Sequence, residues 1–224
     1  MKSNKLVIAI DGPAGAGKST VSKAVAAVLD LTLVDTGAIY RSVAYTAKQS
    51  GVAWDDEAGL AKIVADLQIN FRMQDGQNHV FLEGEDVSQA IRTPEMSEGA
   101  SKVSSVGVVR DGLLELQRTL AGAQGAVLEG RDIGTVVCPD APLKIFLVAT
   151  AEERARRRLA QMEDGGQSGK YEEVLADILA RDKRDSERSQ APLKPAQDAV
   201  HLDCTSMSIQ QVIDSIVSSA RKIS

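Results

Sequence analysis

The sequence is poor in the residues on which several classes of protein depend. Aromatic side chains make up only 3% of its 224 residues, and it has two cysteines and two histidines. Cys138 and Cys204 are too few for a disulfide framework. The isolated His79 and His201 do not have the spacing of a metal site or of a Ser-His-Asp triad. Disulfide scaffolds, zinc proteins and triad hydrolases are therefore disfavoured.

Long apolar runs and an excess of positive charge are also missing. No run of about 18 apolar residues could cross a membrane, and the first five residues lead to a predicted strand without a signal peptide. The formal net charge of −5 disfavours nucleic acid, whose backbone needs a basic surface. We therefore expect a cytoplasmic protein that binds neither nucleic acid nor membranes. We also expect a monomer, because the helical patterns show no obvious exposed apolar face.

The most informative segment, residues 12–19, reads Gly-Pro-Ala-Gly-Ala-Gly-Lys-Ser and completes the phosphate-loop pattern G-x-x-x-x-G-K-[ST]. It follows an apolar run and precedes a helical pattern, which is the context that the motif requires. Glycines let backbone N–H groups surround phosphates, and the helix directs the positive end of its dipole at them. Lys18 would reach the outer phosphates, and the Ser19 hydroxyl would ligate Mg²⁺. The predicted triphosphate site comprises Gly12, Pro13, Ala14, Gly15, Ala16, Gly17, Lys18, Ser19 and Thr20.

Five apolar runs have the composition of buried parallel strands, and helical patterns lie between them. They are residues 6–10, 31–34, 126–128, 143–148 and 199–202. This alternation, with a phosphate loop after the first strand, predicts an α/β fold: a P-loop NTPase core with a five-stranded parallel sheet between two layers of helices. The expected core-facing stripe of the helix after the loop is Val21, Val25, Val28 and Leu29.

One stretch interrupts the alternation with a period of two. Residues 69–73 and 79–82 read as strands, and the Asp75-Gly76 pair between them is a signal for a hairpin turn. Antiparallel strands do not fit the parallel sheet. We therefore predict a small antiparallel insertion at residues 65–106, and a core formed by residues 1–64 and 107–224.

Polar side chains follow the second and third predicted core strands. The first group is Asp35, Thr36 and Arg41, and the second is Glu129, Arg131 and Asp132. Ligands bind at the carboxyl ends of strands in such sheets, so these groups are candidates for holding a polar, anionic acceptor. Taken alone, the first group is as compatible with an ordinary strand-to-helix turn that has a solvated arginine as it is with an acceptor site.

Half of the arginines lie in residues 153–190, on two helical patterns joined by a glycine-rich loop. Such charge runs usually form a solvated face. Some of these residues nevertheless share one side of a helix: Arg181, Asp185 and Arg188 on one, Arg154 and Arg158 on the other. Phosphoryl transfer depends on positioning and charge neutralisation, so we predict that this segment forms a short helical lid over phosphates.

Together these segments resemble the bacterial cytidylate kinases, a branch of the nucleoside monophosphate kinase family, along essentially the whole chain. The segments that carry the resemblance are residues 10–20, 35–41, 82–87, 91–93, 129–137 and 181–185. The resemblance implies that ATP, with Mg²⁺, phosphorylates CMP or dCMP in pyrimidine metabolism. It also implies that the antiparallel insertion binds the nucleoside monophosphate.

The resemblance further implies roles for individual side chains. Lys18 and the loop amides would hold the ATP phosphates. The implied catalytic set is Lys18, Arg131, Arg157, Arg158 and Arg181, with Arg157 and Arg158 as lid arginines at the transferring phosphoryl group. The implied CMP set has Arg41 and Arg131 at the phosphate, Asp185 and Arg181 at the ribose, Ser101, Arg110, Asp132 and Arg188 at the cytosine edge, and also Asp35 and Thr36.

Two positions depart from the family pattern. Thr36 stands where the family often has serine, and Glu129 stands where aspartate is common. The added methyl group and the added methylene bear on fine selectivity, such as CMP against UMP or ribose against deoxyribose. Neither departure affects the expected fold.

The residues by themselves leave two other functions open. A kinase with the same core and a different acceptor, such as another nucleoside monophosphate or shikimate, would share the phosphate loop. A nucleotide-dependent switch would bind ATP or GTP without a small acceptor. A guanine-selective switch is disfavoured, because its [NT]-K-x-D motif is missing: Asn4-Lys5 precedes the first strand, with Val7 in place of the aspartate.

Overall fold

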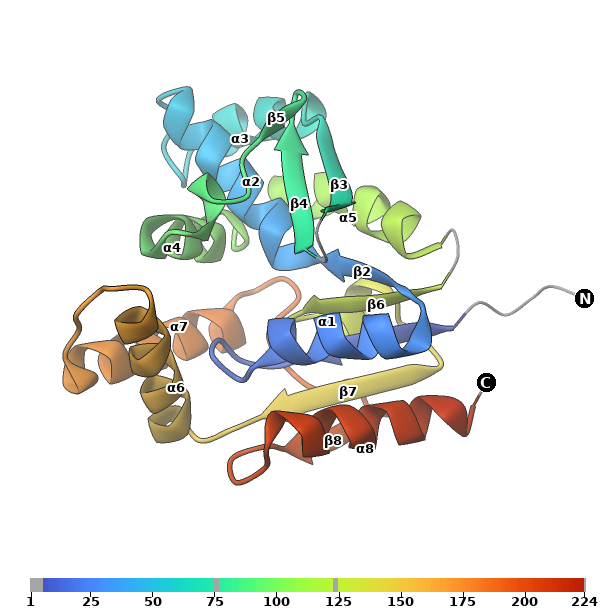
Figure 1. Cartoon of the computed structure of the whole chain (residues 1–224). Coiled ribbons are helices and arrows are strands. Elements are labelled where there is room, and N and C mark those ends of the chain that lie inside the picture. Colours follow the sequence, from blue (N-terminus) through green and yellow to red (C-terminus); the bar gives the residue numbers. More distant parts are fainter. Residues whose placement is uncertain (1–5, 75–76, 123–124, 224) are drawn as a thin grey trace, which may run out of the picture. The chain divides into compact units, whose positions relative to one another are not determined.

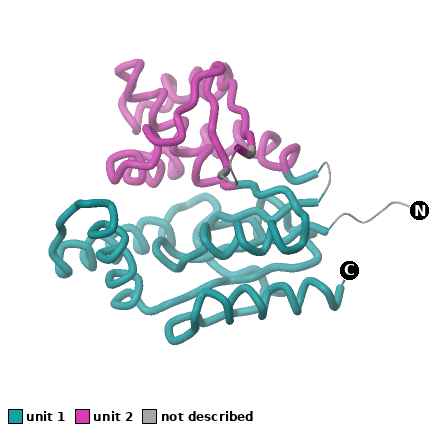
Figure 2. Tube along the Cα trace, in the orientation of Figure 1, with its two compact units in different colours: residues 1–34, 121–224 teal, residues 35–120 magenta. Residues whose placement is uncertain are grey.

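The computed structural model describes residues 6–74, 77–122 and 125–223. The chain forms two compact units (Figure 2). The first unit consists of residues 1–34 and 121–224, and the second consists of residues 35–120.

A five-stranded sheet organises the first unit (Figure 1). Its strands, in the spatial order β2-β6-β1-β7-β8, are β2 (Thr32–Asp35), β6 (Ala126–Gly130), β1 (Val7–Asp11), β7 (Leu143–Val148) and β8 (Val200–Asp203). The central strand β1 pairs in parallel with both β6 and β7, and β7 pairs in parallel with β8. Central strands of this kind are covered on both faces, which explains their continuous apolar runs. The α/β fold predicted from the sequence is confirmed.

Helices α1 (Lys18–Leu29) and α8 (Ile209–Arg221) lie side by side against this sheet and share one hydrophobic core with it (Figure 1). The expected stripe of α1 is wrong at Val28, which is 53% exposed. The buried residues of α1 include Val21, Ser22, Val25 and Ala26. At about 100° per residue, Val28 falls just outside this buried arc, beyond Val21.

The rest of the first unit forms the surroundings of the phosphate loop. A π-helical segment, η2 (Ile133–Val137), follows β6. Helices α6 (Ala151–Asp164) and α7 (Tyr171–Glu187) follow β7 and occupy the segment predicted as a lid. They pack on each other through Ala155, Val174 and Ile178.

The second unit combines helices with a three-stranded sheet (Figure 1). Its elements are α2 (Thr36–Gln49), α3 (Glu57–Ala65), β3 (Ile69–Gln74), β4 (Gln77–Leu82), β5 (Glu85–Asp86), a 3-10 turn η1 (Ala90–Arg92), α4 (Pro94–Val103) and α5 (Gly107–Gly122), whose last residues belong to the first unit. Strands β3 and β4 are antiparallel, as the period of two predicts. The predicted turn residues Asp75 and Gly76 lie outside the described residues.

This unit is wider than the insertion expected at residues 65–106. The three strands do fall within that range, but α2 and α5 pack with α4 around a shared core that includes Ile39, Val43 and Leu113. The strands cannot bury enough apolar surface by themselves, since a short sheet needs a packed layer on one face.

Candidate functional site

The phosphate loop joins β1 to α1, whose first residue is Lys18. Gly12, at φ +149°, lies so close to β7 that a Cβ built on it would be 2.0 Å from the carbonyl oxygen of Leu147. Only glycine therefore lets the chain leave β1 along this path. Gly17 is the N-cap of α1 and has a left-handed conformation. The loop thus ends at the positive end of a helix dipole, which is the arrangement that anion binding uses.

The side chain of Lys18 is buried and folds over this loop. Its Nζ donates hydrogen bonds to the carbonyl oxygens of Gly12, at 2.8 Å, and Pro13, at 2.7 Å. Burial and then the positive charge of Arg131 lower the pKa of Lys18 well below its ordinary value, while Glu129 opposes the shift. An anion beside Nζ would raise that pKa again and offset the repulsion between cations, so this cluster favours a phosphate group.

The sequence patterns do not single out Asp11, the last residue of β1. Its carboxylate accepts hydrogen bonds from the backbone N–H groups of Ile133 and Gly134, both at 2.8 Å. These residues begin η2, directly after Arg131 and Asp132. Asp11 therefore ties the start of the phosphate loop to the segment that carries two predicted site residues. The only signal for it is an acid directly before the first glycine of the motif.

Asp11 gives a testable dependence of stability on pH. Burial raises the pKa of Asp11 from 3.8 to about 6, with a smaller contribution from Asp132, although the two amides and Lys18 oppose the shift. Between these values the folded chain keeps a proton that the unfolded chain has lost, so the stability that this group contributes falls as pH rises. We expect the free energy of unfolding of wild type, relative to Asp11→Asn, to fall by about 2 kcal/mol from about pH 4 to about pH 7.

Urea denaturation of both proteins across this pH range measures the difference. Asp11→Asn is the reference because it keeps the size of the side chain and removes the titration. A difference that stays constant, or that grows as pH rises, would contradict the raised pKa.

Four predicted residues come together in the first unit around α7. Arg131 Nε donates to Asp185 Oδ2 at 2.9 Å, and the Asp185 side chain is 4% exposed. Burial alone would raise the pKa of Asp185, but the nearby charges of Arg131, Arg181 and Arg188 outweigh it and lower the pKa. Three guanidinium groups therefore surround one buried carboxylate. Asp132, also buried, follows Arg131 and is the N-cap of η2.

The two arginines predicted to act from the lid, Arg157 and Arg158, differ in their surroundings. Arg157 Nε donates to Glu153 at 3.0 Å, and its Nη2 donates to the carbonyl oxygen of Cys204 at 2.7 Å. Arg157 is therefore held against Cys204, in the loop that follows β8. Arg158 is half-buried and makes no hydrogen bond or ion pair with the part of the chain that the structure describes.

The second unit holds the remaining predicted residues. Asp35 caps α2 by accepting the Ala38 N–H at 2.9 Å, and its other oxygen pairs with Arg41 Nη2 at 2.9 Å. Thr36, the first residue of α2, is buried. The Asp35–Arg41 pair leaves the Nε of Arg41 buried without a hydrogen-bond partner among the described residues.

Ser101 and Arg110 lie on α4 and α5 of the same unit, and both are buried. Ser101 Oγ has no hydrogen-bond partner within residues 6–74, 77–122 and 125–223. Arg110 Nη1 donates to the carbonyl oxygen of Ser104 at 3.2 Å, and its guanidinium lies 5.6 Å from the centre of the Tyr40 ring. Neither side chain has the exposure of a solvated surface residue. A buried hydroxyl without a partner is costly unless a ligand satisfies it.

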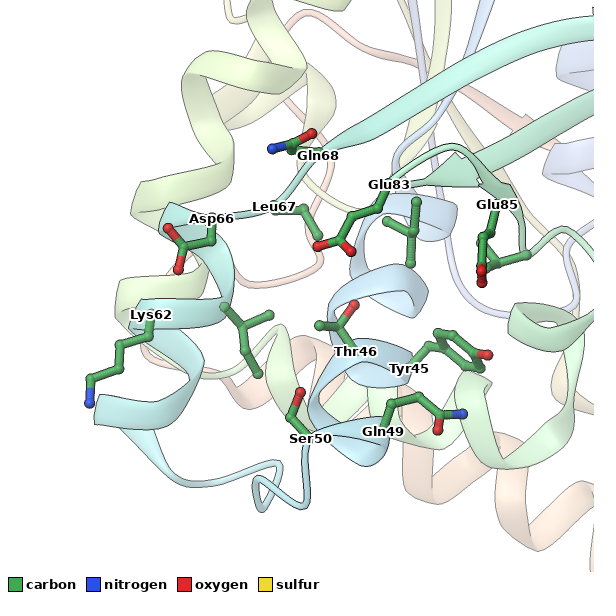
Figure 3. Close-up of a pocket in the computed structure, with 13 residues that line it drawn as sticks. Tyr45, Thr46, Gln49, Ser50, Lys62, Asp66, Leu67, Gln68, Glu83 and Glu85 are labelled. Atoms are coloured by element: carbon green, nitrogen blue, oxygen red, sulfur yellow. The ribbon is translucent and has the colours of Figure 1, made fainter.

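A pocket of about 620 Å³ also lies in the second unit, beside α2, α3 and the end of β4 (Figure 3). Its charged lining is Lys62, Asp66, Glu83 and Glu85 (Figure 3). None of the predicted site residues is among the described residues that line it. Three acids against one lysine disfavour a phosphate, so we do not assign nucleotide binding to this pocket.

The donor set for a metal ion is sparse. No cluster of three or more histidine, cysteine, aspartate or glutamate side chains suited to a metal is found in the described part of the chain. The hydroxyl-bearing Ser19 is exposed at the start of α1. This fits Mg²⁺ that arrives with a triphosphate, because such an ion takes most of its ligands from phosphates and water. No helix within the described ranges has the length and apolar character to cross a membrane.

Comparison with known proteins decides which family this arrangement belongs to. The family model described as cytidylate kinase matches residues 8–222. The chain belongs to the cytidylate kinase family. It is 50% identical to the cytidylate kinase of Pasteurella multocida, over 94% of this chain and 93% of that protein. It is 49% identical to the cytidylate kinase of Geobacter sulfurreducens, over 97% of this chain and 93% of that protein.

A solved structure supports the fold independently. An uncharacterized protein from Eubacterium ventriosum matches with a TM-score of 0.52 and 14% identity, over 97% of this chain and 99% of that chain. At this identity the likeness shows the fold alone. The membership of the cytidylate kinase family therefore rests on the sequence matches, and the structure adds the geometry of the site.

Proposed function

We propose that this member of the cytidylate kinase family transfers the γ-phosphoryl group of ATP to CMP or dCMP, which gives ADP and CDP or dCDP. It is a phosphotransferase with a phosphate group as acceptor. The observation that carries the proposal is the buried Lys18 on the phosphate loop, in one unit with Arg131 and Arg181, whose charges act on its pKa. Such a set of cations suits phosphates better than any neutral ligand.

On the donor side, the loop amides of residues 12–20 and Lys18 would bind the ATP phosphates. Arg131, Arg181, Arg157 and Arg158 would neutralise the charge of the transferring group. No covalent intermediate is needed, and the acceptor oxygen of a monophosphate is already ionised. Catalysis therefore rests on positioning and charge rather than on a strong base.

On the acceptor side, the proposed contacts follow the family resemblance. Arg41 and Arg131 would bind the CMP phosphate, Asp185 and Arg181 the ribose. The side chains proposed for the cytosine edge are Ser101, Arg110, Asp132 and Arg188. Asp35 and Thr36 complete the proposed CMP set. The buried Ser101 hydroxyl without a partner supports this role, because a hydrogen bond from the base would satisfy it.

Magnesium is the proposed metal, and Ser19 is the residue that would hold it together with the phosphates of ATP. The charge of Mg²⁺ would offset the negative charge on the phosphate oxygens. The protein itself would orient those phosphates through the loop amides and Lys18. We further propose that the protein acts in the cytoplasm as a monomer.

An acceptor screen tests the proposed function. ADP release from Mg-ATP would be measured with CMP, dCMP, UMP, AMP, GMP and shikimate. Rapid turnover with CMP and dCMP alone is the expected result. Turnover with another acceptor would keep the kinase and overturn the cytosine assignments, whereas slow hydrolysis without any stimulation would favour a nucleotide-dependent switch.

A substitution at the end of α7 tests the cytosine assignment. We expect Arg188→Ala to raise the KM for CMP by about 30-fold, since it removes a charged hydrogen-bond donor from the base. The KM for ATP is expected to stay within about twofold, because no donor contact is proposed for Arg188. Arg184→Ala, an exposed arginine on the same helix, is the matched control. Equal changes in both KM values would remove Arg188 from the cytosine site.

A further inference from the structure

Arg154 donates hydrogen bonds from all three nitrogens of its guanidinium. It lies in the first turns of α6 and is 5% exposed. Its Nε donates to the carbonyl oxygen of Ala149 at 2.9 Å, and its Nη1 donates to that of Ala14 at 3.0 Å. Its Nη2 donates to Asp182 Oδ2 at 2.6 Å. One guanidinium therefore joins three segments of the first unit.

The bond to Ala14 reaches into the phosphate loop. The carbonyl of Ala14 shares a planar trans peptide with the N–H of Gly15, so the two groups point in opposite directions. A guanidinium that fixes the carbonyl on the α6 side therefore turns the Gly15 N–H away from α6. A phosphate loop needs its amides turned toward the anion in this way. The approach is close, because a Cβ on Gly15 would lie 3.2 Å from the Cβ of Arg154.

The bond to Asp182 reaches α7. Asp182 lies next to Arg181 in the sequence and three residues before Asp185, so its position sets the rotation of the helix face that carries both. The second oxygen of Asp182 is buried and accepts no hydrogen bond from the described residues. Arg154 is therefore the partner that holds this carboxylate, and through it the helix.

We propose that Arg154 is a positioning residue that fixes the phosphate loop and α7 relative to each other. It orients the Gly15 amide toward the triphosphate. It also fixes the rotation of α7, so that Arg181 and Asp185 face the acceptor. The inference rests on the proposed kinase activity and deepens it. Arg154 does not touch the reacting atoms. Its three guanidinium nitrogens each reach a different acceptor, which the single nitrogen of a lysine cannot do.

Two variants separate the bond to the phosphate loop from the bond to α7. Arg154→Lys keeps the charge and loses the fork, so we expect both the Kd for a non-hydrolysable ATP analogue and the KM for CMP to rise about tenfold, with kcat reduced. Asp182→Asn keeps the bond to Ala14, so we expect the KM for CMP to rise and the Kd for the analogue to stay unchanged. Arg156→Ala, an exposed neighbour on α6, is the matched control and is expected to behave as wild type.

Hydrogen exchange supplies a readout that does not depend on turnover. We expect faster exchange in residues 12–17 and 171–187 for Arg154→Lys, and in residues 171–187 alone for Asp182→Asn. A lower Tm for Arg154→Lys with wild-type Kd, KM and kcat would show a merely structural arginine and overturn the proposal. Wild type that fails to phosphorylate CMP would overturn the proposed acceptor instead, while analogue binding and exchange still decide the role of Arg154.

Discussion

Lys18→Ala is expected to lower kcat by about 10³-fold with ATP and CMP, which is the scale for loss of a charged group at a transferring phosphoryl group. The physical reason is the position of Nζ, which is buried at the carbonyl oxygens of Gly12 and Pro13 in the phosphate loop. Arg131, whose charge acts on Lys18, cannot substitute for it without leaving Asp185, with which it pairs. A coupled assay of ADP release measures the loss.

The same variant should keep its stability. The lowered pKa of Lys18 means that the folded chain disfavours the charged ammonium, so its removal does not cost a favourable charge interaction. Lys23→Ala, an exposed lysine further along α1, is the control and is expected to retain full activity. Turnover by Lys18→Ala within about tenfold of wild type would remove Lys18 from the catalytic set.

Gly12→Ala is expected to lower the free energy of unfolding by about 4 kcal/mol, at the upper end of single-residue effects. A Cβ at this position would lie 2.0 Å from the carbonyl oxygen of Leu147, and that atom belongs to the backbone of β7. Since β7 pairs with β1 on one side and β8 on the other, it cannot move aside without loss of sheet hydrogen bonds.

Gly17→Ala supplies the matched comparison for this test. Gly17 also has a positive φ, of 89°, but a Cβ there would meet no atom within 4 Å. We expect it to cost about 1 kcal/mol, from backbone strain alone. Urea denaturation of the two variants separates contact with β7 from strain. Equal losses at Gly12 and Gly17 would mean that β7 yields to the added methyl group.

Local patterns predicted the elements of this fold well. The five apolar runs correspond to the five strands of the sheet, and the period of two predicted the antiparallel pair β3–β4. Asp56 caps α3, and Ser208 forms a full capping box with Gln211 at the start of α8; both are residue types that N-cap positions favour. Periodicity failed at Val28, because it gives the spacing of apolar residues but not the direction from which a neighbouring layer covers them.

What the sequence determined by itself is the five parallel strands, the antiparallel pair, the phosphate loop and, through its similarity to known relatives, the family. The tertiary structure alone decided which distant groups meet: Arg154 with Ala14, Asp11 with the start of η2, and Arg131 with Asp185. It also decided that the second compact unit runs over residues 35–120. Strand and helix patterns depend on neighbours within a few residues, whereas these contacts join segments from 54 to 140 residues apart. Such pairs form only when the sheet and its helices pack, so no local pattern contains them.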